Sequence, residues 1–510
     1  MKKLLLIMLA ASALAVNAQK KATDPRTFAA SITETDLSRH LYTIAGKEME
    51  GRETATHGQR MAATYIENHF KAIGLMPGFQ GGYQMQFPVY RDSMIDARLV
   101  LNGKSLGLHS DFQPLTQFNH NSTQYFSEIV FVGHGIVDSA YDDYGTQDVK
   151  GRAVLMLEGA PSGFRPSRGG FMSPAGTFGK IQQAQQKGAV AVLMVGAGFP
   201  RRATTQLGSM FTELFKPTQS PNIYTISDQA AAIIIGKGWN DIKETGKKKQ
   251  VLPSVFSVNT ELEFRKKTIF LESSNVMGMI EGTDKKDEYL VLSAHYDHLG
   301  KRGDVIYYGA DDDGSGTVGV MEIAEAFVKA KAAGKGPRRS IIFMAVSGEE
   351  KGLWGSEYYS ENPTVPLEKV TANLNIDMIG RTDTERMTGD TLNYIYVVGD
   401  DKISSDLKPV SESVNTKFTK LVLDYKFNDP NDKNRIYFRS DHYNFARKGV
   451  PIIFYYDGML KADYHKPTDT PDKINYPLLA KRAKLVFHTA WEMANRNDML
   501  KRDIPLASAN

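Results

Sequence analysis

The chain has 510 residues, more than one hydrophobic core usually supports, and this length predicts at least two domains. Its formal net charge of +4 is small, which argues against nucleic acid or an anionic membrane as a partner. The sequence contains no cysteine, so disulfide bonds and thiolate zinc sites are excluded. Histidine and carboxylate side chains would have to bind any metal.

Residues 1–18 have the pattern of a cleavable export signal. Two lysines near the N-terminus precede an apolar stretch from Leu4 to Leu14, and small residues lead up to Gln19. No later run reaches the roughly 20 apolar residues that a membrane-spanning helix needs. The sequence therefore predicts export to a periplasm or out of the cell without a stable membrane anchor, and it leaves the oligomeric state open.

Three regions with different patterns follow the signal. Residues 23–120 begin with helical spacing between Asp36 and Leu75, and we assign them to the first part of the main domain. Residues 121–262 carry short β runs and one helix, which indicates an inserted domain. In residues 263–505 apolar runs alternate with helical stretches, as in βαβ units, and this region completes the main domain.

The apolar runs of the last region are continuous, which favours strands that are covered on both faces. These runs are residues 289–293, 340–346, 372–376, 394–398 and 451–455. The sequence therefore predicts an α/β fold in three layers, with a mixed, mostly parallel sheet between two layers of helices.

Polar side chains follow these runs where the predicted strands end. In an open α/β sheet, ligands bind beyond the carboxyl ends of the strands, so we expect these side chains to converge in one crevice. They are His295, Glu349, Glu350, Asp377 and His465, with Asp311, Asp312 and Asp313 between the first two.

Each of these features alone has a structural explanation. The three aspartates could cap the following helix, and paired glutamates are usually solvated. Together, the acidic groups would repel one another strongly without a cation. Imidazole nitrogen and carboxylate oxygen suit zinc, at about 2.0–2.2 Å, although cobalt or manganese could occupy the same ligands.

The adjacent glutamates indicate a hydrolytic mechanism. Glu350 can bind a metal while Glu349 takes a proton from metal-bound water and later passes it to the leaving amine. Asp297, two residues after His295, is placed to accept the other N–H of that imidazole. Spacing alone cannot choose among the three adjacent aspartates.

The ordered motifs His-x-Asp, Gly-Ala-Asp-Asp-Asp-Gly-Ser-Gly, Gly-Glu-Glu, Asn-Ile-Asp-Met and Tyr-His-x-x-x-Asp-Thr resemble the cocatalytic dizinc aminopeptidases related to glutamate carboxypeptidase and the transferrin receptor. This resemblance implies the zinc-exopeptidase (phosphorylase/hydrolase-like) form of the αβα sandwich and two Zn²⁺ per chain. By position, His295 and Asp377 would bind one zinc, Glu350 and His465 the other, and Asp312 both. Glu349 matches the general base.

For other residues the resemblance implies a role less directly. Tyr437 stands where some members place a tyrosine that hydrogen-bonds the tetrahedral intermediate, but it could equally be a packing residue. His298 and His442 exceed the ligand count, and we expect both to form hydrogen bonds in loops. The inserted region resembles a β-rich protease-associated (PA) domain, through residues 148–155 and 187–192, which implies a lid or substrate-positioning role.

The resemblance implies an exported aminopeptidase that hydrolyses N-terminal residues from peptide substrates through a metal-bridging hydroxide and a glutamate base. A carboxypeptidase is the nearest alternative, because Arg435 or Arg439 could bind a terminal carboxylate, although a surface salt bridge would explain either arginine. A glutaminyl cyclase-like acyltransferase and a non-catalytic receptor are further alternatives. The complete set of ligand residues argues against both.

Overall fold

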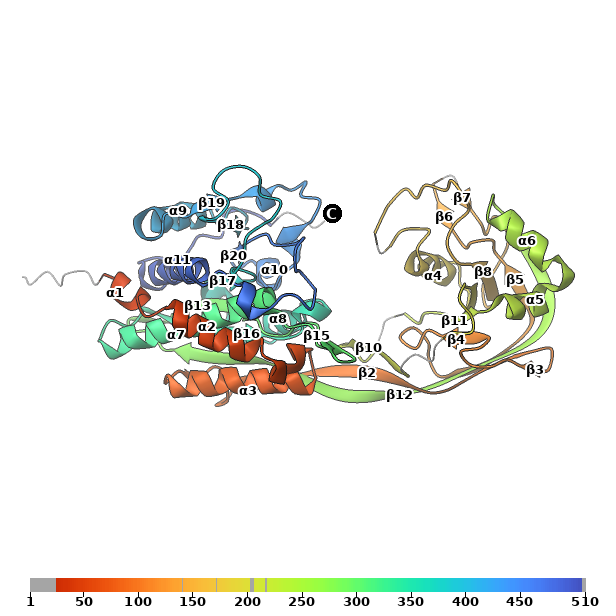
Figure 1. Ribbon diagram of the computed structural model, residues 1–510, viewed down its shortest axis with the longest axis horizontal. Helices are drawn as coiled ribbons and strands as arrows, with labels where there is room; N and C mark the ends of the chain where they lie inside the picture. Colours follow the sequence, from red (N-terminus) through yellow and green to blue (C-terminus); the bar gives the residue numbers. More distant parts are fainter. Residues whose placement is uncertain (1–23, 140, 171, 202–205, 216–217, 507–510) are drawn as a thin grey trace, which may run out of the picture. The chain divides into compact units, whose positions relative to one another are not determined.

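The computed structural model describes residues 24–139, 141–170, 172–201, 206–215 and 218–506, and these form two compact units (Figure 1). Unit 1 comprises the described residues up to Phe87 and from Ser273 onward, and unit 2 runs from Pro88 to Glu272. The predicted export signal, residues 1–18, lies outside the described residues. No helix in the described part is long and apolar enough to cross a membrane.

Unit 1 contains a mixed, mostly parallel sheet. Its strands, in spatial order, are β19 (Val422–Asp424), β18 (Tyr394–Val398), β20 (Ile452–Tyr456), β17 (Val370–Ile376), β13 (Lys285–His295), β16 (Arg339–Val346) and the end of β12 (Ser254–Ile280). Strands β20, β17, β13 and β16 are parallel, whereas β12 is antiparallel to β16 and β18 is antiparallel to β20. The continuous apolar runs in the sequence correspond to the buried centre of this sheet.

Helices cover both faces of the unit 1 sheet, so the predicted three-layer α/β fold is confirmed (Figure 1). One face packs against α1 (Arg26–Ala29), α2 (Glu34–Ile44), α3 (His57–Ala72), α7 (Gly316–Ala332), α9 (Leu407–Phe418) and α11 (Tyr476–Asn495). The other face packs against α8 (Trp354–Glu361) and α10 (His442–Arg447). Side-chain caps fix the starts of α2 and α11, where Thr33 and Asn475 accept backbone N–H groups.

Strand register brings the predicted site residues to one edge of this sheet. His295, the last residue of β13, is paired with Val346, the last residue of β16. Ile376, the last residue of β17, is paired with Tyr455 of β20. The residues that follow these strands therefore emerge at the same carboxyl edge.

Unit 2 also contains a mainly parallel sheet, with strands β5 (Ser122–Phe131), β8 (Ala153–Leu157), β9 (Ala191–Val195) and β11 (Asn222–Ile226). Antiparallel β4 (Phe112–Pro114) forms one edge, and β12 pairs with β5 at the other. Helix α4 (Thr177–Gln186) packs on one face, and α5 (Asp228–Ile235) and α6 (Trp239–Gly246) lie on the other. The sequence analysis expected one helix here, because the run Ala230–Ile235 is too apolar to show a helical pattern.

The division between the units differs from the predicted domain of residues 121–262. Strand β2 (Gln84–Leu101) runs without interruption from unit 1 into unit 2, and β12 leads back. Leu99, Leu101 and Phe112 pack in a core cluster of unit 2. Residues 88–120 therefore belong to unit 2, and no turn marks the boundary in the sequence.

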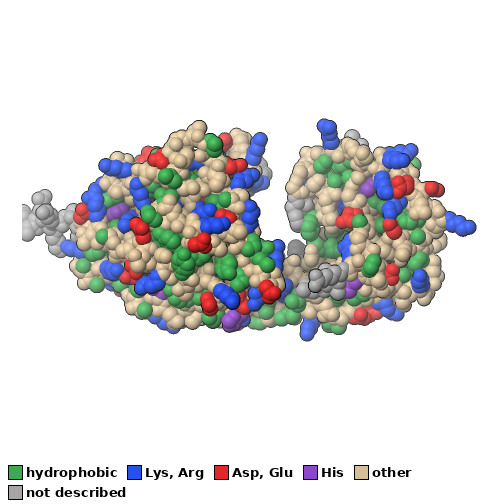
Figure 2. Space-filling model, viewed as in Figure 1, with side chains coloured by type: hydrophobic (Ala, Val, Ile, Leu, Met, Phe, Trp, Pro, Cys, Tyr) green, Lys and Arg blue, Asp and Glu red, His purple; other side chains and the backbone are tan. Residues whose placement is uncertain are grey.

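The remaining described strands are short. They are β1 (Met76–Pro77), β3 (Lys104–Ser105), β6 (Val137–Asp138), β7 (Tyr141–Asp142), β10 (Leu207–Phe211), β14 (Lys301–Arg302) and β15 (Val305–Ile306). Acidic and basic side chains are interspersed on the face shown in Figure 2, in keeping with the small net charge.

Candidate metal centre

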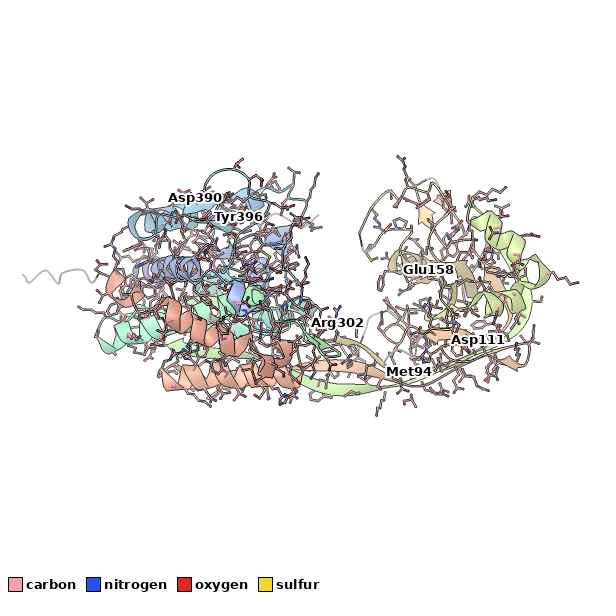
Figure 3. The ribbon with its side chains drawn as sticks, in the orientation of Figure 1. Met94, Asp111, Glu158, Arg302, Asp390 and Tyr396 are labelled. Atoms are coloured by element: carbon pink, nitrogen blue, oxygen red, sulfur yellow. The ribbon has the colours of Figure 1, made fainter. Side chains whose placement is uncertain are left out.

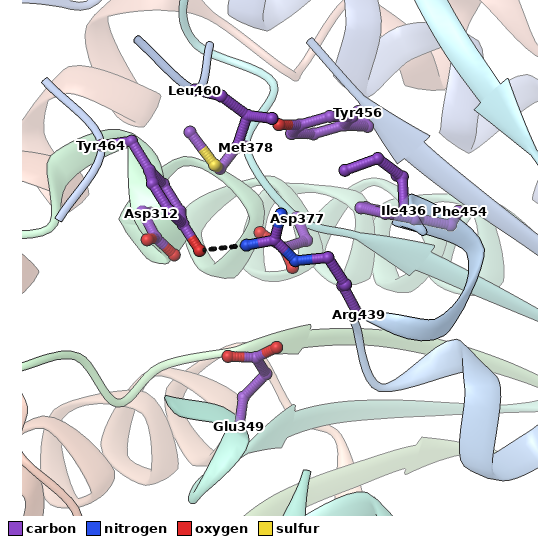
Figure 4. A pocket seen from close by; sticks show the side chains of 10 residues that line it. All are labelled: Asp312, Glu349, Asp377, Met378, Ile436, Arg439, Phe454, Tyr456, Leu460 and Tyr464. Carbon is purple, nitrogen blue, oxygen red and sulfur yellow. Dashed lines mark hydrogen bonds between the residues drawn. The ribbon is translucent and has the colours of Figure 1, made fainter. Parts of the chain in front are cut away.

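The predicted metal-binding side chains lie together at the carboxyl edge of the unit 1 sheet. His295 ends β13, Asp377 follows β17, and Glu350 lies in the turn after β16. Asp312 comes from the loop before α7, and His465 from the loop after β20. Figure 4 shows Asp312, Asp377 and Glu349 at the pocket beside this group.

His295 and two carboxylates form the first half of the group. Its Nε2 atom lies 3.3 Å from Asp312 Oδ1 and 3.6 Å from Asp377 Oδ1. Glu349 Oε2 is 3.8 Å from the same nitrogen. His295, Asp377 and Glu349 offer ligand atoms close enough to one another to hold one metal ion.

His465 and Glu350 form the second half. His465 Nε2 lies 3.1 Å from Glu350 Oε2 and 3.2 Å from Asp312 Oδ2. One carboxylate oxygen of Asp312 thus lies close to His295, and the other lies close to His465. Among the three adjacent aspartates, Asp312 has the geometry of a bridge between two cations.

His298 belongs to this group, although the sequence analysis expected only a hydrogen-bonding loop residue. Its ring is fully buried, and Nδ1 lies 2.9 Å from Glu350 Oε1 and 3.8 Å from Asp312 Oδ2. His298, Asp312 and Glu350 form a second set that could hold a metal ion. The spacing His295-x-x-His298 after one strand was the signal that could have identified it.

The donor atoms fit a cation. Buried atoms His295 Nε2, Asp312 Oδ2 and Glu350 Oε1 have no hydrogen-bond partner among the described residues. Burial opposes the charge of His295, yet Glu349 and Asp377 raise its pKa well above the usual value. Burial likewise opposes the charge of Asp312, but the neighbouring imidazoles of His295 and His465 hold its pKa well below the usual value. This combination of imidazole and carboxylate donors suits zinc.

Asp297 orients His295 through a different atom from the one predicted. His295 Nδ1 lies 3.0 Å from the backbone carbonyl of Asp297, whereas the Asp297 carboxylate is 3.8 Å away. That carboxylate instead accepts hydrogen bonds from Thr54 Oγ1 at 2.7 Å and from the backbone N–H of Glu349 at 3.2 Å. Asp297 therefore fixes the imidazole with its carbonyl and the turn at Glu349 with its side chain.

The aspartates beside Asp312 hold the backbone. Asp313 accepts N–H groups from Met378 and Gly316, at 3.0 and 2.8 Å. Asp311 accepts the N–H of Gly380 at 2.8 Å. These bonds attach the loop before α7 to the segment after β17, so Asp312 alone of the three presents both oxygens to the histidines.

Tyr437 is not among the residues that line the pocket, although Ile436 and Arg439 are. Its ring lies against Phe438 and Tyr443, and burial raises the pKa of its hydroxyl. His442 lies 2.8 Å from the Tyr437 carbonyl through Nε2, which is the hydrogen-bonding role expected of that histidine. Tyr437 is thus a packed residue in the structure, and its catalytic role stays a prediction.

Tyr464 is a second tyrosine near the metal centre, and it lines the pocket. Its ring stacks on His465 with centroids 3.8 Å apart, and its hydroxyl accepts a hydrogen bond from Arg439 Nη2 at 2.9 Å (Figure 4). Both residues line the pocket with Glu349. The adjacency of Tyr464 and His465 in one motif was the signal that could have identified the tyrosine.

The pocket beside the metal centre has one polar and one apolar wall. Asp312, Glu349 and Asp377 form the polar wall, with Arg439 and Tyr464 at its side. The apolar wall consists of Met378, Ile436, Phe454, Tyr456 and Leu460. The pocket therefore brings apolar side chains next to the carboxylates of the metal centre.

Glu349 is suited to proton transfer. Burial, together with the neighbouring Glu350 and Asp377, raises its pKa well above the usual value, while His295 opposes this rise. Its carboxylate lines the pocket. A carboxylate with raised proton affinity next to the reacting bond can accept a proton from water and release it again.

Comparison with known proteins agrees with this geometry. Residues 275–490 match the model of Peptidase family M28. A protein of Arthroderma otae named as a probable leucine aminopeptidase is 32% identical over 219 residues, which are 42% of this chain and 56% of that protein. A protein of Arabidopsis thaliana named as a probable glutamate carboxypeptidase is 37% identical over 117 residues, 23% of this chain and 16% of that protein. The chain thus spans little more than half the length of the first of these relatives.

Solved structures share the fold. An aminopeptidase from Aneurinibacillus sp. strain AM-1 has a TM-score of 0.56 and 17% identity, covering 96% of this chain and all of that one. A zinc aminopeptidase from Bacillus subtilis has a TM-score of 0.53 and 18% identity, covering 93% of this chain and 99% of that one. The match of residues 275–490 to the model of Peptidase family M28 agrees with the resemblance seen in the motifs.

Proposed function

We propose that the protein is a zinc aminopeptidase with two zinc ions in each chain. The position of Asp312, with one oxygen on His295 and the other on His465, is the observation that carries this proposal. Asp377 completes the ligands on the His295 side and Glu350 those on the His465 side. His298 lies beside Glu350 and is an additional candidate ligand on that side.

The chain's own residues then have separate roles. Bound zinc would supply a Lewis acid that polarises the scissile carbonyl and lowers the pKa of water. Glu349 takes the proton of the attacking water and delivers it to the leaving amine. Tyr464, with its hydroxyl held by Arg439, replaces Tyr437 as the candidate that hydrogen-bonds the carbonyl oxygen as negative charge develops.

The apolar wall of the pocket supports a preference for apolar N-terminal residues. Met378, Ile436 and Phe454 are almost completely buried and can contact an aliphatic or aromatic side chain. An acidic or basic side chain would lose its hydration there without gaining a partner on that wall. Leucine and similar residues are therefore the proposed first residues of the substrate.

A carboxypeptidase remains the second candidate, since Arg439 lies in the pocket and carries a positive charge. Its guanidinium already donates to Tyr464, which favours a role in holding that hydroxyl. Arg435 lies over the ring of Phe438, 4.8 Å from its centroid, and does not line the pocket. The arginines thus give the carboxypeptidase little support.

Substrate and metal measurements test the proposal together. We expect about two zinc ions per chain, hydrolysis of leucyl chromogenic substrates, and loss of activity on chelation with recovery on zinc addition. Peptides blocked at the N-terminus should resist cleavage, whereas those blocked at the C-terminus should be cleaved. The opposite pattern supports the carboxypeptidase, and activity that survives complete zinc removal would refute the zinc mechanism.

We also propose export, with unit 2 as a substrate-positioning PA domain. The N-terminal pattern of residues 1–18 supports export, and residues 148–155 and 187–192 support the domain assignment. N-terminal sequencing of the secreted or periplasmic protein should begin at Gln19. Retention of the full chain in the cytoplasm would contradict the export proposal.

A further inference from the structure

Arg52 is a fully buried arginine of unit 1 with no part in the reaction described above. It ends the short 3₁₀ segment η1 (Lys47–Arg52), far upstream of the matched peptidase domain of residues 275–490. Long cationic side chains are rarely buried completely, so the position calls for a physical explanation.

The guanidinium binds backbone carbonyls of the two loops that carry metal-site residues. Nε donates to the carbonyl of Tyr296 at 2.6 Å, next to His295. Nη1 and Nη2 donate to the carbonyls of Tyr308 and Gly309, each at 2.8 Å, just before the aspartates. Arg52 therefore connects the end of β13 to the loop of Asp312.

The backbone around Arg52 is fixed against the same loops. The N–H of His298 donates to the Arg52 carbonyl, and the N–H of Gly300 donates to the Gly51 carbonyl at 2.9 Å. Gly51 has φ of +70°, and a Cβ there would come within 2.4 Å of the carbonyl oxygens of Gly300 and Tyr307. Only glycine fits this close approach, which places the backbone next to Arg52 directly against the loop after β13.

The charge of Arg52 faces carboxylates without pairing to one of them. Its guanidinium donates to carbonyls, while Asp297, Asp469 and Asp312 contribute attractive charge from nearby. Burial lowers the pKa of Arg52 to about 10, so the guanidinium stays charged at neutral pH. It offsets part of the negative charge and leaves the carboxylate oxygens to a metal.

We propose that Arg52 is a positioning residue of the metal centre, which keeps His295 and Asp312 at ligating separation by binding the carbonyls of both loops. The inference rests on the proposed zinc function. It assigns to the N-terminal segment a role that the peptidase domain of residues 275–490 does not contain.

The test compares Arg52→Lys and Arg52→Gln with a matched control, Arg339→Lys. Arg339 is also fully buried and donates to the carbonyls of Met493 and Arg496 at 2.9 and 2.7 Å, and it additionally pairs with Glu288 at 2.7 Å. It begins β16, so it lies at the opposite end of that strand from Glu349. The control therefore removes a buried guanidinium that binds carbonyls far from the metal centre.

Zinc affinity is measured by competition with a chromophoric chelator on the full chain, alongside the absorption spectrum of the cobalt-loaded protein and the melting temperature of the metal-free protein. We expect both Arg52 variants to bind zinc about 10- to 100-fold more weakly and to change the cobalt spectrum. Arg339→Lys should lower the melting temperature while zinc affinity and spectrum stay at wild-type values.

Wild-type zinc affinity and an unchanged cobalt spectrum in the Arg52 variants would overturn the inference, whatever their melting temperatures. If neither Arg52 variant folds with zinc while Arg339→Lys does, Arg52 is a general requirement for folding and the inference fails. Failure of the wild-type chain itself to bind zinc refutes the proposed function instead.

Discussion

Both units place polar side chains beyond the carboxyl ends of buried parallel strands, but the two edges differ in charge pairing. In unit 1, His295 and Asp312 have buried donor atoms that no described residue satisfies. In unit 2, the corresponding pocket contains Glu158, Asp228 and Lys243, and Lys243 forms an ion pair with Asp228 (Glu158 is labelled in Figure 3).

A buried lysine adds to this difference in charge between the two units. Lys180 of α4 donates to the backbone carbonyls of Leu157 and Gly159 at the end of β8. In unit 2, lysine side chains thus provide positive charge at the strand ends. In unit 1, carboxylates and histidines lie together at the strand ends. Topology gives the location of a site in an α/β sheet, and the balance of charges at that location determines whether it requires a metal.

The largest expected effect is the replacement of the proposed base. Glu349→Gln should preserve zinc content, because Asp312, Asp377, Glu350 and the histidines remain, but should lower kcat by about 10²–10⁴-fold since the amide cannot accept a proton. Metal analysis and steady-state kinetics check both parts. Glu158→Gln makes the same change beyond a strand of unit 2 and should leave kcat and zinc content unchanged. Near-normal kcat in Glu349→Gln would remove Glu349 from the mechanism.

A smaller effect separates the two tyrosines. Tyr464→Phe should lower kcat by about 10- to 10²-fold with little change in zinc content, because it removes a hydroxyl that Arg439 holds in the pocket. Tyr437→Phe removes a hydroxyl from a packed ring outside the pocket lining, and kcat should stay within about twofold of wild type. Kinetics on one leucyl substrate compare them, and a larger loss in Tyr437→Phe would reverse the assignment.

The sequence predicted the main features of unit 1 because strand ends and their polar successors are local patterns. The buried runs gave β16, β17 and β20, and the side chains that follow them meet at one edge. The carbonyl of Asp297, rather than its carboxylate, binds His295 because of the path of the backbone after β13, which spacing does not report. Tyr464 and Tyr437 are both near matched motifs, and the structure shows which of them lines the pocket.

The role of the N-terminal segment could not be predicted from the sequence either. Arg52 acts through carbonyls of residues more than two hundred positions away in the chain, and any residue type supplies a carbonyl. The unit boundary was misplaced for a related reason: β2 and β12 cross it as continuous strands, so neither composition nor a turn marks it.

The smallest expected effect is opposite pH dependence of the two units in the metal-free protein. Burial alone would lower the pKa of His465, but hydrogen bonds to Asp312 and Glu350 raise it to about 10, above the ordinary value of about 6.5. The folded state then holds more protons than the unfolded state between these values, so unit 1 loses stability as pH rises from 7 to 9. Because His465 is partly exposed, we expect less than about 1 kcal/mol per pH unit.

Lys180 gives unit 2 the opposite sign. Burial lowers its pKa to about 8 from an ordinary value of about 10.4, so above pH 8 the unfolded state holds more protons and folding becomes more favourable. Amide hydrogen exchange, corrected for the intrinsic pH dependence, should show protection falling in unit 1 and rising slightly in unit 2 between pH 7 and 9. His465→Gln should reduce the first change, Lys180→Met should abolish the second, and zinc should remove the first because a ligating imidazole is neutral. If protection changed with the same sign in both units, the charge difference between their strand ends that the structure indicates would be contradicted.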